Sequence, residues 1–499
     1  MLDQSFSADN FRILLDVANR KGTYIEALNF FGNDDIFKES REKSEELIRI
    51  NKDIRIESKK IKLLNATNND HTKYAELTIR KEEIKEEREQ LLNLILESIS
   101  SKTNNEDFKL ELKKGEIKRG KQLYIVPNIP ENYFSLKQIQ RNIYKTFGVK
   151  QADRRIIISQ LACLLNDGFP KIVLRTDITE FYESIPHAVL FSEIEENPLL
   201  NQPTKKIIKN LLHQYWNILV NDELKTSSNV RTGIPRGIGL SAYLAELYMR
   251  KFDKIIKSLD SVTYYARYVD DIIIIFTPNN RNENKSPDDY ENQIRTIAQE
   301  NFGLSLHVEK TKLLDLKKRH SDRINPEKYE ITYLGYSFIV NYESSSNEKS
   351  ETAIKRPSLQ ILMSQQKRDR YIQKIKLTIN DYRLKRIKYS DKDSGNKKIL
   401  YQRIRFLTNN YQLFRRKSNV FIGVYFSNEF ITAPYNDLKE LDDILKSEID
   451  KVKDSFNLKF AQKLSNLSFL KGFQDKAILQ FIASKEFKIE KLMSIWRNL

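Results

Sequence analysis

The chain has 499 residues, 40% of them hydrophobic, which is enough apolar material for two or three domains with cores of their own. Its 85 Lys and Arg residues exceed the 68 Asp and Glu residues, and the formal charge of +17 favours a polyanionic partner, nucleic acid above an anionic membrane. No apolar run approaches the roughly 18 residues that span a bilayer, and the single Cys163 excludes a disulfide framework. We therefore expect a cytoplasmic protein with no membrane partner, in which Cys163 is a small core residue.

Residues 36 to 120 are dense in Glu, Lys and Arg, and their apolar residues repeat every seven positions. The two series are Leu47, Ile54 and Ile61, and then Leu77, Ile84 and Leu91. The turn-like segment NATNNDH lies between them. This spacing predicts two long helices packed as an antiparallel hairpin. The charges of its surface are read as a solvated face rather than as a dedicated RNA-binding arm.

Residues 121 to 345 alternate between strand-like and helical patterns, which is typical of a mixed α and β domain. The segments KIVLRTDI and TYYARYV predict strands, and SAYLAELYMRKFDKII predicts an amphipathic helix. The polar segment TPNNRNENKSPDDYENQ, residues 277 to 293, predicts a surface loop.

The pattern from about residue 360 to the end is mostly helical. Leu438, Leu441 and Leu445 share one helix face with Ile449 and Val452. The segment KYSDKDSGNKK, residues 388 to 398, predicts a flexible loop between two of these helices. No motif in this region indicates a chemical role, so packing and oligomer contacts are its expected roles.

Two aspartates stand side by side in the segment ARYVDDIIIIF. The run from Ile272 to Phe276 is short, β-branched and apolar, which predicts a strand buried on both faces. Asp270 and Asp271 would then lie at the joint of a hairpin. Aspartate is common in turns, so this pair becomes a candidate for catalysis only if other segments supply partners.

Asp177, at the end of the strand KIVLRTDI, is the third carboxylate that such a site needs. Three anions held together repel one another, and this cost is relieved when they bind metal. Magnesium prefers hard oxygen ligands, and two ions about 3.5–4 Å apart can clamp the attacking and leaving oxygens of a phosphoryl transfer. The alternative for Asp177 is a cap of the helix that follows.

Histidine and cysteine offer no competing site. The five histidines are scattered without a close pair, none follows His320, and neither a nucleophile elbow nor a P-loop motif is present. Any metal chemistry must therefore use carboxylates.

The segment GIPRGIGLSAYLAELYM lies between Asp177 and the aspartate pair. Gly233, Gly237 and Gly239 would let the backbone approach a flat partner closely, and Ser241 could cap the helix that follows. A simple glycine-rich turn is the alternative.

Taken in order, these segments resemble the motifs of the reverse transcriptases over residues 120 to 345. The resemblance implies that Asp177, Ile178, Asp270 and Asp271 bind two Mg²⁺ ions, with the three aspartates catalytic. It also implies that Tyr182 screens against the ribose 2′-hydroxyl. The segment GLSLHVEKTKLL resembles the next motif and places Lys310 where a lysine protonates the pyrophosphate leaving group.

The resemblance assigns further binding roles. GIPRGIGLS resembles the loop that positions template and nucleotide, so Arg236, Gly237 and Ser241 are candidate nucleotide-binding residues. VKQADRRIIISQL resembles the fingers region, where Arg154 is a candidate triphosphate contact that could equally pair with a nearby acid. YLGYSF resembles the hairpin that grips the primer, which implies that role for Tyr333, Leu334, Gly335 and Tyr336.

Two positions depart from the family pattern. Arg236 stands where many relatives have Gln, and His307 stands where Asn is common. Both leave nucleotide selectivity and templating open.

Three further segments resemble the bacterial defense-associated and abortive-infection reverse transcriptases. They are NFRILLDVANRKG, GIPRGIGLSAYLAELYM and YQRIRFLTNNYQLF with VFIGVYFSNEFI. Members of that group act against bacteriophage, often form homo-oligomers, and in several cases make DNA with a noncoding RNA or with no template.

We therefore expect an α/β (α+β) right-hand polymerase fold with fingers and palm of the reverse-transcriptase type. The expected domains are an N-terminal segment with the helical hairpin at 1–120, fingers and palm at 121–345, and a thumb-like, mostly α-helical domain at 346–499. The expected activity is Mg²⁺-dependent DNA synthesis from dNTPs in antiphage defense, with a noncoding RNA as template or scaffold, a DNA product and a homo-oligomer. The alternatives are a retron- or intron-type enzyme that copies its own RNA and a non-catalytic RNA-binding scaffold.

Overall fold

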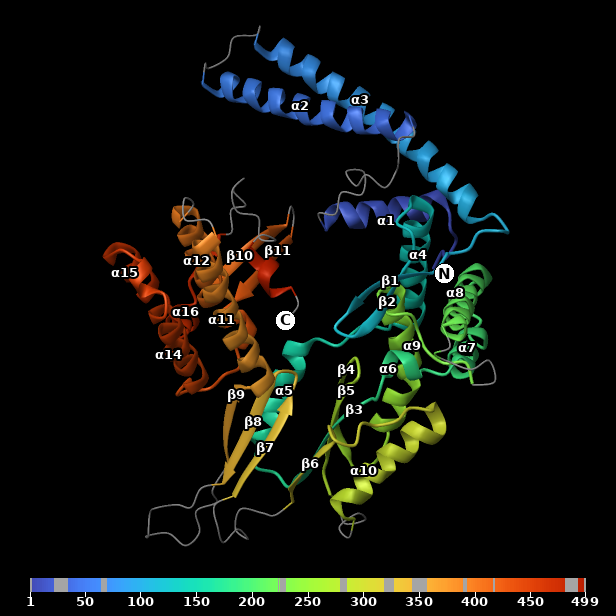
Figure 1. The fold of residues 1–499 in the computed structure, drawn as a ribbon. Coiled ribbons are helices and arrows are strands. Elements are labelled where there is room, and N and C mark those ends of the chain that lie inside the picture. Colours follow the sequence, from blue (N-terminus) through green and yellow to red (C-terminus); the bar gives the residue numbers. More distant parts are fainter. Residues whose placement is uncertain are drawn as a thin grey trace. The chain divides into compact units, whose positions relative to one another are not determined.

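The computed structural model describes residues 2–21, 35–63, 70–222, 224, 230–278, 285–317, 327–342, 357–388, 393–415, 418–480 and 492–497 (Figure 1). The chain divides into two compact units, each built from two separate stretches. The first unit is Met1–Lys150 with Tyr182–Arg250, and the second is Gln151–Phe181 with Lys251–Leu499. The domain boundaries expected at residues 120 and 345 stay a prediction.

The first unit is mainly helical. Its elements are α1 Ala8–Arg20, α2 Asp35–Leu63, α3 Asp70–Thr103, β1 Lys113–Lys118, β2 Lys121–Ile125, α4 Pro130–Phe147, α7 His187–Glu195 and α8 Gln202–Asn221. The short helix α6, Phe181–Ser184, and the long helix α9, Gly239–Lys257, each continue across a unit boundary. Strands β1 and β2 form an antiparallel pair.

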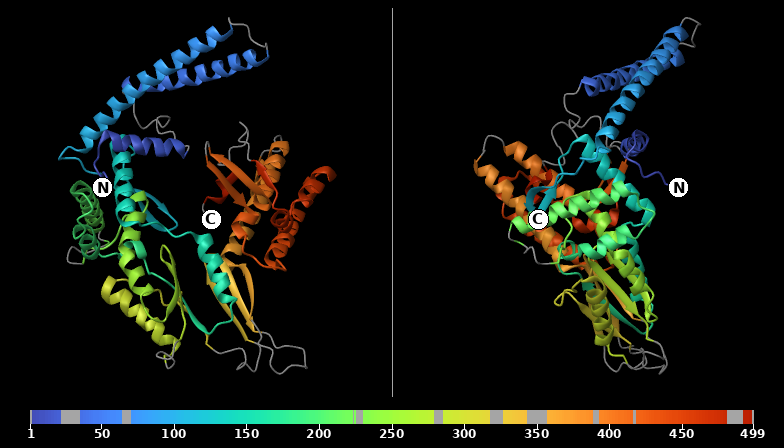
Figure 2. Two further views of the ribbon diagram at one scale, coloured as in Figure 1. Left: turned by 180° about the vertical axis from the view of Figure 1, so that it is seen from behind. Right: turned by 90° about the vertical axis from the view of Figure 1, so that its right-hand side faces the viewer.

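Helices α2 and α3 lie side by side in both views of Figure 2, which confirms the predicted hairpin. Ile84, one of the heptad residues, is fully buried. Ion pairs such as Lys43 with Glu87, at 2.5 Å between Nζ and Oε2, add contacts between the two helices. The other five heptad residues are half-buried, so the seven-residue spacing marks the less exposed face of each helix. The turn-like segment NATNNDH lies largely outside the described residues.

The second unit contains a four-stranded antiparallel sheet in the order β4-β5-β3-β6. These strands are β3 Lys171–Asp177, β4 Val262–Tyr268, β5 Asp271–Phe276 and β6 Lys312–Leu316. Strand β5 is central, and every residue from Ile272 to Phe276 is at most 2% exposed. The predicted strand buried on both faces is therefore confirmed, as are the strands at KIVLRTDI and TYYARYV and the helix at SAYLAELYMRKFDKII.

Two smaller sheets and a group of helices complete the second unit. The strands are β7 Glu327–Tyr333, β8 Tyr336–Tyr342 and β9 Ser358–Met363 in one sheet, and β10 Asn410–Arg415, β11 Ser418–Gly423 and β12 Ile478–Gln480 in the other. The helices are α5 Arg154–Leu165, α10 Pro287–Thr296, α11 Gln365–Lys388, α12 Asp393–Thr408, α13 Val424–Asn428, α14 Asn436–Asp450, α15 Leu458–Ser465 and α16 Phe469–Asp475. A short π-helix lies at Ile297–Asn301, and short 3₁₀ helices lie at Lys453–Ser455 and Ser494–Trp496.

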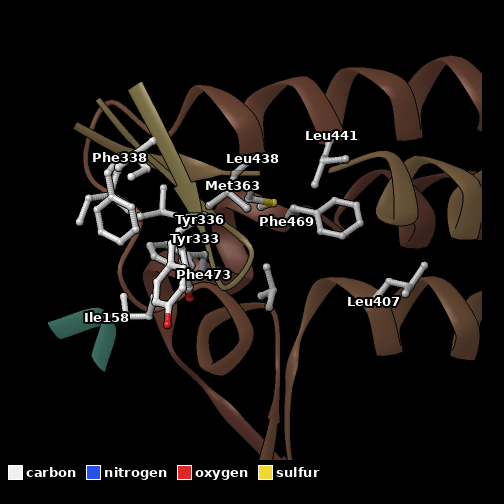
Figure 3. Packing of buried hydrophobic residues seen from close by; sticks show 14 of the residues in the cluster. Ile158, Tyr333, Tyr336, Phe338, Met363, Leu407, Leu438, Leu441, Phe469 and Phe473 are labelled. Atoms are coloured by element: carbon white, nitrogen blue, oxygen red, sulfur yellow. The ribbon is translucent and has the colours of Figure 1, made fainter. Parts of the chain in front are cut away.

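One hydrophobic core joins helix α5, the β7-β8-β9 sheet and the C-terminal helices (Figure 3). Leu438, Leu441 and Leu445 of α14 are buried in it, so the predicted apolar face of that helix is confirmed. Tyr336 and Phe469 are buried in the same core. Apolar packing of Tyr336 in this core therefore holds the hairpin between β7 and β8 in place.

Several local predictions were wrong. Residues 287 to 293 are the start of α10 rather than loop, because Ser286 and Asp289 form a capping box; residues 279 to 284 lie outside the described part. Helix α12 already begins at Asp393, within the segment predicted as a flexible loop, and residues 389 to 392 are not described. Cys163 is exposed on α5 rather than in the core.

The C-terminal region is dominated by helices as expected, but it also holds strands that sequence reasoning did not identify. Strand β10 pairs in parallel with β12, and β11 lies on its other side. Among the described residues, no helix is long and apolar enough to cross a membrane.

Candidate active site

Strand pairing brings the three predicted aspartates together. Asp177 is the last residue of β3 and lies directly opposite Asp271, the first residue of β5. Asp270 occupies the two-residue turn between β4 and β5, and its carbonyl accepts a hydrogen bond from the Ile178 amide at 3.2 Å. The predicted hairpin joint is therefore confirmed. Sheet register alone thus places the three residues at the same end of the sheet.

The turn that carries Asp270 is strained. Val269 has φ of 62°, a left-handed conformation that is an outlier for a β-branched residue. The Val269 carbonyl accepts a hydrogen bond from the Arg267 guanidinium at 2.9 Å, and the same guanidinium pairs with Asp253 at 2.8 Å. Strain of this kind persists where the surroundings hold it in place, and it is frequent at functional sites.

Two basic side chains engage the carboxylates. The Lys310 ammonium donates to Oδ2 of Asp177 at 2.5 Å, and the Arg175 guanidinium donates to Oδ1 of Asp271 at 2.7 Å. Arg175 also donates to the backbone carbonyl of Lys310 at 2.8 Å. Sequence reasoning missed Arg175. Its signal was its position two residues before Asp177, which places both side chains on one face of β3.

The ionised forms of Asp270 and Asp271 are disfavoured. Burial, and then the charges of Asp177 and Asp271, raise the pKa of Asp270 above its usual value. Burial also raises the pKa of Asp271, although Arg175 acts in the opposite direction. A cation bound among these groups would relieve the repulsion.

The residues present fit magnesium. In the part of the chain that the structure describes, no group of three or more His, Cys, Asp or Glu side chains is positioned to hold a metal ion. Asp177 pairs with Lys310, and Asp271 pairs with Arg175. Mg²⁺ is nevertheless commonly held by only one or two carboxylates together with water and substrate phosphates. Asp177, Asp270 and Asp271 supply hard oxygen ligands of that kind at one end of the sheet.

The segment YLGYSF forms the hairpin between β7 and β8, with Tyr333 opposite Tyr336. Leu334 and Gly335 have positive φ angles of 43° and 77°, as a tight two-residue turn requires. The Tyr333 hydroxyl donates to the backbone carbonyl of Asp271 at 3.1 Å. The hairpin is thus tied directly to the aspartate pair, and its role toward a primer stays a prediction.

Arg154, the candidate triphosphate contact, lies at the start of α5 against this hairpin. Its guanidinium donates to the Leu334 carbonyl, at 3.1 Å from Nε, and lies 5.7 Å from the centre of the Tyr336 ring. Its recorded partner is therefore a backbone carbonyl rather than the acid considered as an alternative. A role for Arg154 toward nucleotides stays a prediction.

The remaining predicted residues belong to the first unit. The Arg236 guanidinium donates to both carboxylate oxygens of Glu183, at 2.6 and 2.9 Å, and lies 4.8 Å from the centre of the Tyr182 ring. Sequence reasoning missed Glu183, whose only signal was its position next to Tyr182. Burial acts to raise the pKa of Glu183, but the hydrogen bonds and charge of Arg236 outweigh it, so this pKa lies below its usual value.

Gly237 approaches this chain's own backbone closely. Its φ is 101°, and a Cβ added to it would lie 2.6 Å from the Tyr124 carbonyl oxygen. The Tyr124 amide donates to the Arg236 carbonyl at 2.7 Å. Glycine at 237 is therefore required for packing of the loop against β2, independently of any ligand.

Ser241 does not cap α9, contrary to the prediction. The helix begins at Gly239, and the buried Ser241 hydroxyl donates to the Pro235 carbonyl at 2.5 Å. Ser241 therefore braces the loop from within the first turn of the helix. The prediction started the helix after Ser241, whereas it already starts at Gly239, because Gly237 and Gly239 were interpreted as part of the loop.

Residues 133–338 match the family described as reverse transcriptase (RNA-dependent DNA polymerase). The matched range encloses the three aspartates, Lys310 and the loop with Arg236. The chain therefore contains a domain that matches the reverse transcriptases, and the prediction of a reverse-transcriptase fold is confirmed. No curated protein has a sequence that matches this chain.

Solved structures with similarity to the chain include telomerases of two yeasts. Apo telomerase from Candida tropicalis truncated from its C-terminal domain is 13% identical, with a TM-score of 0.32, over 46% of this chain and 53% of that one. Telomerase from Candida albicans in complex with a TWJ fragment of telomeric RNA is 12% identical, with a TM-score of 0.34, over 74% of this chain and 65% of that one. The chain thus spans about half and about two thirds of their lengths.

Proposed function

We propose that this chain is a Mg²⁺-dependent reverse transcriptase that makes DNA from dNTPs in bacterial antiphage defense. The observation that carries the catalytic part is the register of β3 and β5, which sets Asp177 opposite Asp271 with Asp270 in the adjoining turn. These residues lie inside the matched reverse transcriptase domain.

The aspartates and the backbone carbonyl of Ile178 would hold Mg²⁺, which supplies charge neutralisation to a phosphoryl transfer when it is bound. Asp270 and Asp271 are prepared for a cation because burial and like charges disfavour their ionised forms.

Lys310 is the candidate proton donor to the pyrophosphate leaving group. Its side chain is 51% exposed while its ammonium contacts Asp177. An exposed lysine can turn from the carboxylate toward a phosphate without a change in the backbone.

Tyr182 and Arg236 are the candidate selectivity residues. The bidentate pair with Glu183 fixes the Arg236 guanidinium beside the Tyr182 ring, so the ring orientation depends on this pair. An Arg in place of Gln at this position would then act through Tyr182 on the choice between deoxyribonucleotides and ribonucleotides.

The defense role is supported by the resemblance of NFRILLDVANRKG, GIPRGIGLSAYLAELYM and the segment from YQRIRFLTNN to VFIGVYFSNEFI to the defense-associated reverse transcriptases. The net charge of +17 supports a nucleic-acid partner, either a noncoding RNA template or an RNA scaffold. A cytoplasmic homo-oligomer that makes templated or untemplated DNA completes the proposal.

The test compares Asp270→Ala/Asp271→Ala with the wild type and with Asp443→Ala, a change at an exposed position of α14. We expect the double variant to lose both nucleotide incorporation and phage protection, whereas Asp443→Ala keeps both. Protection by a folded double variant would contradict a catalytic role in defense.

The nucleic acid that copurifies with the protein should be sequenced before and after addition of dNTPs and Mg²⁺. A defined RNA with complementary new DNA supports templated synthesis, and DNA without a matching RNA supports untemplated synthesis. RNA encoded beside the gene within an intron or an inverted repeat, together with no effect on phage, would favour the retron- or intron-type alternative. Absence of incorporation with every primer would favour the RNA-binding scaffold.

A further inference from the structure

A cavity of about 370 Å³ lies in the second unit among α5, the tip of the β7-β8 hairpin, α11 and α13. Its lining contains five basic side chains and one acidic side chain. The basic residues are Arg154, Arg155, Lys367, Arg370 and Lys374, and the acid is Glu429. We call this cavity the basic pocket. Asp177, Asp270, Asp271 and Lys310 are not among its lining residues.

Glu429, the acidic residue of the basic pocket, is paired with Arg155. Arg155 donates to both carboxylate oxygens of Glu429 at 2.6 Å. Lys367 and Arg154 instead donate to the backbone carbonyls of Ser427 and Leu334. The Glu429 carboxylate therefore pairs with Arg155, and the other four basic side chains have no further carboxylate in the lining of the basic pocket.

The positive charge carries a cost that an anion would relieve. Burial, and then the charge of Arg154, lower the pKa of Lys367 to about 7. Burial, and then the charge of Arg370, also lower the pKa of Lys374. Asp437 acts in the opposite direction on Lys367 but does not offset burial and the charge of Arg154, so the protonated form of both lysines is disfavoured in the folded chain. A phosphate group is the anion that several Arg and Lys side chains bind together.

Aromatic rings form the remaining wall of the basic pocket. Tyr336, Tyr371, Phe426 and Phe430 line it. Tyr336 packs edge-to-face with Phe430, with 5.8 Å between ring centres, and the Lys367 ammonium lies 4.4 Å from the Tyr336 ring centre. Flat rings beside cations suit a ligand that combines a phosphate with a base.

We propose that the basic pocket binds the phosphate of a nucleotide unit, supplied either by a free nucleotide or by the 5′ end of a nucleic-acid strand. The basic pocket includes Arg154 and Tyr336, which the resemblance assigns to triphosphate contact and to the primer hairpin, so the inference rests on the proposed function and extends it. Binding itself needs neither metal nor turnover, so it can be tested apart from catalysis. Arg370 and Lys374 are the residues to change. Arg370 is exposed on α11, and within the described residues no hydrogen bond or ion pair is recorded for it.

The experiment measures binding by the full chain in EDTA, which removes any contribution of divalent metal at the aspartates. The probe is a 3′-fluorescein trithymidylate with either a 5′-phosphate or a 5′-hydroxyl, and the readout is fluorescence anisotropy. We expect the wild type to bind the 5′-phosphate form about tenfold more tightly, the effect of one or two charge-assisted hydrogen bonds. Arg370→Ala/Lys374→Ala should lose this preference, whereas Lys376→Ala, at an exposed position of the same helix, should keep it.

Unlabelled dATP distinguishes the two sources. Competition by dATP at concentrations similar to the trinucleotide supports a free nucleotide, and competition by the trinucleotide alone supports a strand end. Equal binding of the two probes by the wild type would overturn the proposal, as would a preference that survives in Arg370→Ala/Lys374→Ala. If that variant does not fold, Glu429→Gln provides the test, because removal of the single acid should tighten binding of the 5′-phosphate probe severalfold. Unchanged or weaker binding by folded Glu429→Gln would then overturn it.

Discussion

Replacement of Asp270 by Asn should make the protein more stable and less active at the same time. Asp270 is half-buried, and burial and the charges of Asp177 and Asp271 raise its pKa. No hydrogen bond from a cationic side chain to its carboxylate is recorded among the described residues, in contrast to Asp177 and Asp271. The neutral amide of Asn has the same size as the carboxylate and removes its repulsion from Asp177 and Asp271. Lys310 and Arg175 keep their partners, because these are Asp177 and Asp271 rather than Asp270.

We expect Asp270→Asn to raise the free energy of unfolding by about 0.5–2 kcal/mol, the usual size of a single stabilising substitution. The melting temperature of a chain of this size would rise by about 1–4 °C. DNA synthesis should fall at least about a hundredfold, as when one electrostatic contact to a reacting group is removed. Asp271→Asn should gain less stability, because it deprives Arg175 of its carboxylate at 2.7 Å.

The stability difference between Asp270→Asn and the wild type should depend on pH. The folded-state pKa of Asp270 lies above its unfolded value, so its ionisation destabilises the folded chain fully above the folded pKa and not at all below the unfolded one. The advantage of Asp270→Asn should therefore be largest near neutral pH and vanish as the pH falls to about 4. Thermal melting at a series of pH values, with primer extension on the same samples, measures both effects. A variant less stable than the wild type at neutral pH would refute the reasoning.

Three further outcomes are expected. Mg²⁺ at about ten times its Kd should stabilise the wild type by about 1.4 kcal/mol in thermal melting without nucleotide, whereas Asp270→Asn should respond less and EDTA should reverse the effect. Glu183→Gln should lower the free energy of unfolding by about 1–3 kcal/mol, because it breaks the half-buried ion pair with Arg236. The pKa of Glu183 in the folded chain lies below its usual value of 4.5. In denaturant unfolding at a series of pH values, the stability advantage of the wild type should therefore fade only as the pH falls below that value. Gly237→Ala should cost about 1–3 kcal/mol in denaturant unfolding, because its φ is 101° and its Cβ would meet the Tyr124 carbonyl at 2.6 Å.

The parts of the fold that depend on local periodicity could be predicted from the sequence. The seven-residue spacing predicted the pairing of α2 and α3, and the isoleucine run predicted the burial of β5, because each pattern matches the geometry of one element. The aspartate turn was equally accessible, since its position follows from the two strands that flank it. Ser286 and Asp289 also carried a capping signal for α10, which the polar composition of the segment obscured.

Partners distant in sequence could not be predicted in this way. Arg175 meets the carbonyl of Lys310 only because β3 pairs with β6 in one register, and that register has no local signature. Strand β12 pairs with β10 across more than sixty residues, as the partners Ile478 and Asn410 show. The Tyr333 hydroxyl contact with Asp271 likewise depends on how the β7-β8 hairpin packs on the neighbouring sheet.

The two cations at the aspartates differ in how freely they can move. Lys310 is 51% exposed and has one recorded contact through its ammonium, whereas Arg175 is 18% exposed and holds Asp271 as well as the backbone carbonyl of Lys310. A metal ion that took Oδ2 of Asp177 as a ligand would displace the ammonium of Lys310 and could leave Arg175 in place. Because Arg175 donates to the Lys310 carbonyl, the released ammonium would stay near the aspartates, as the proposed role of Lys310 as a proton donor requires.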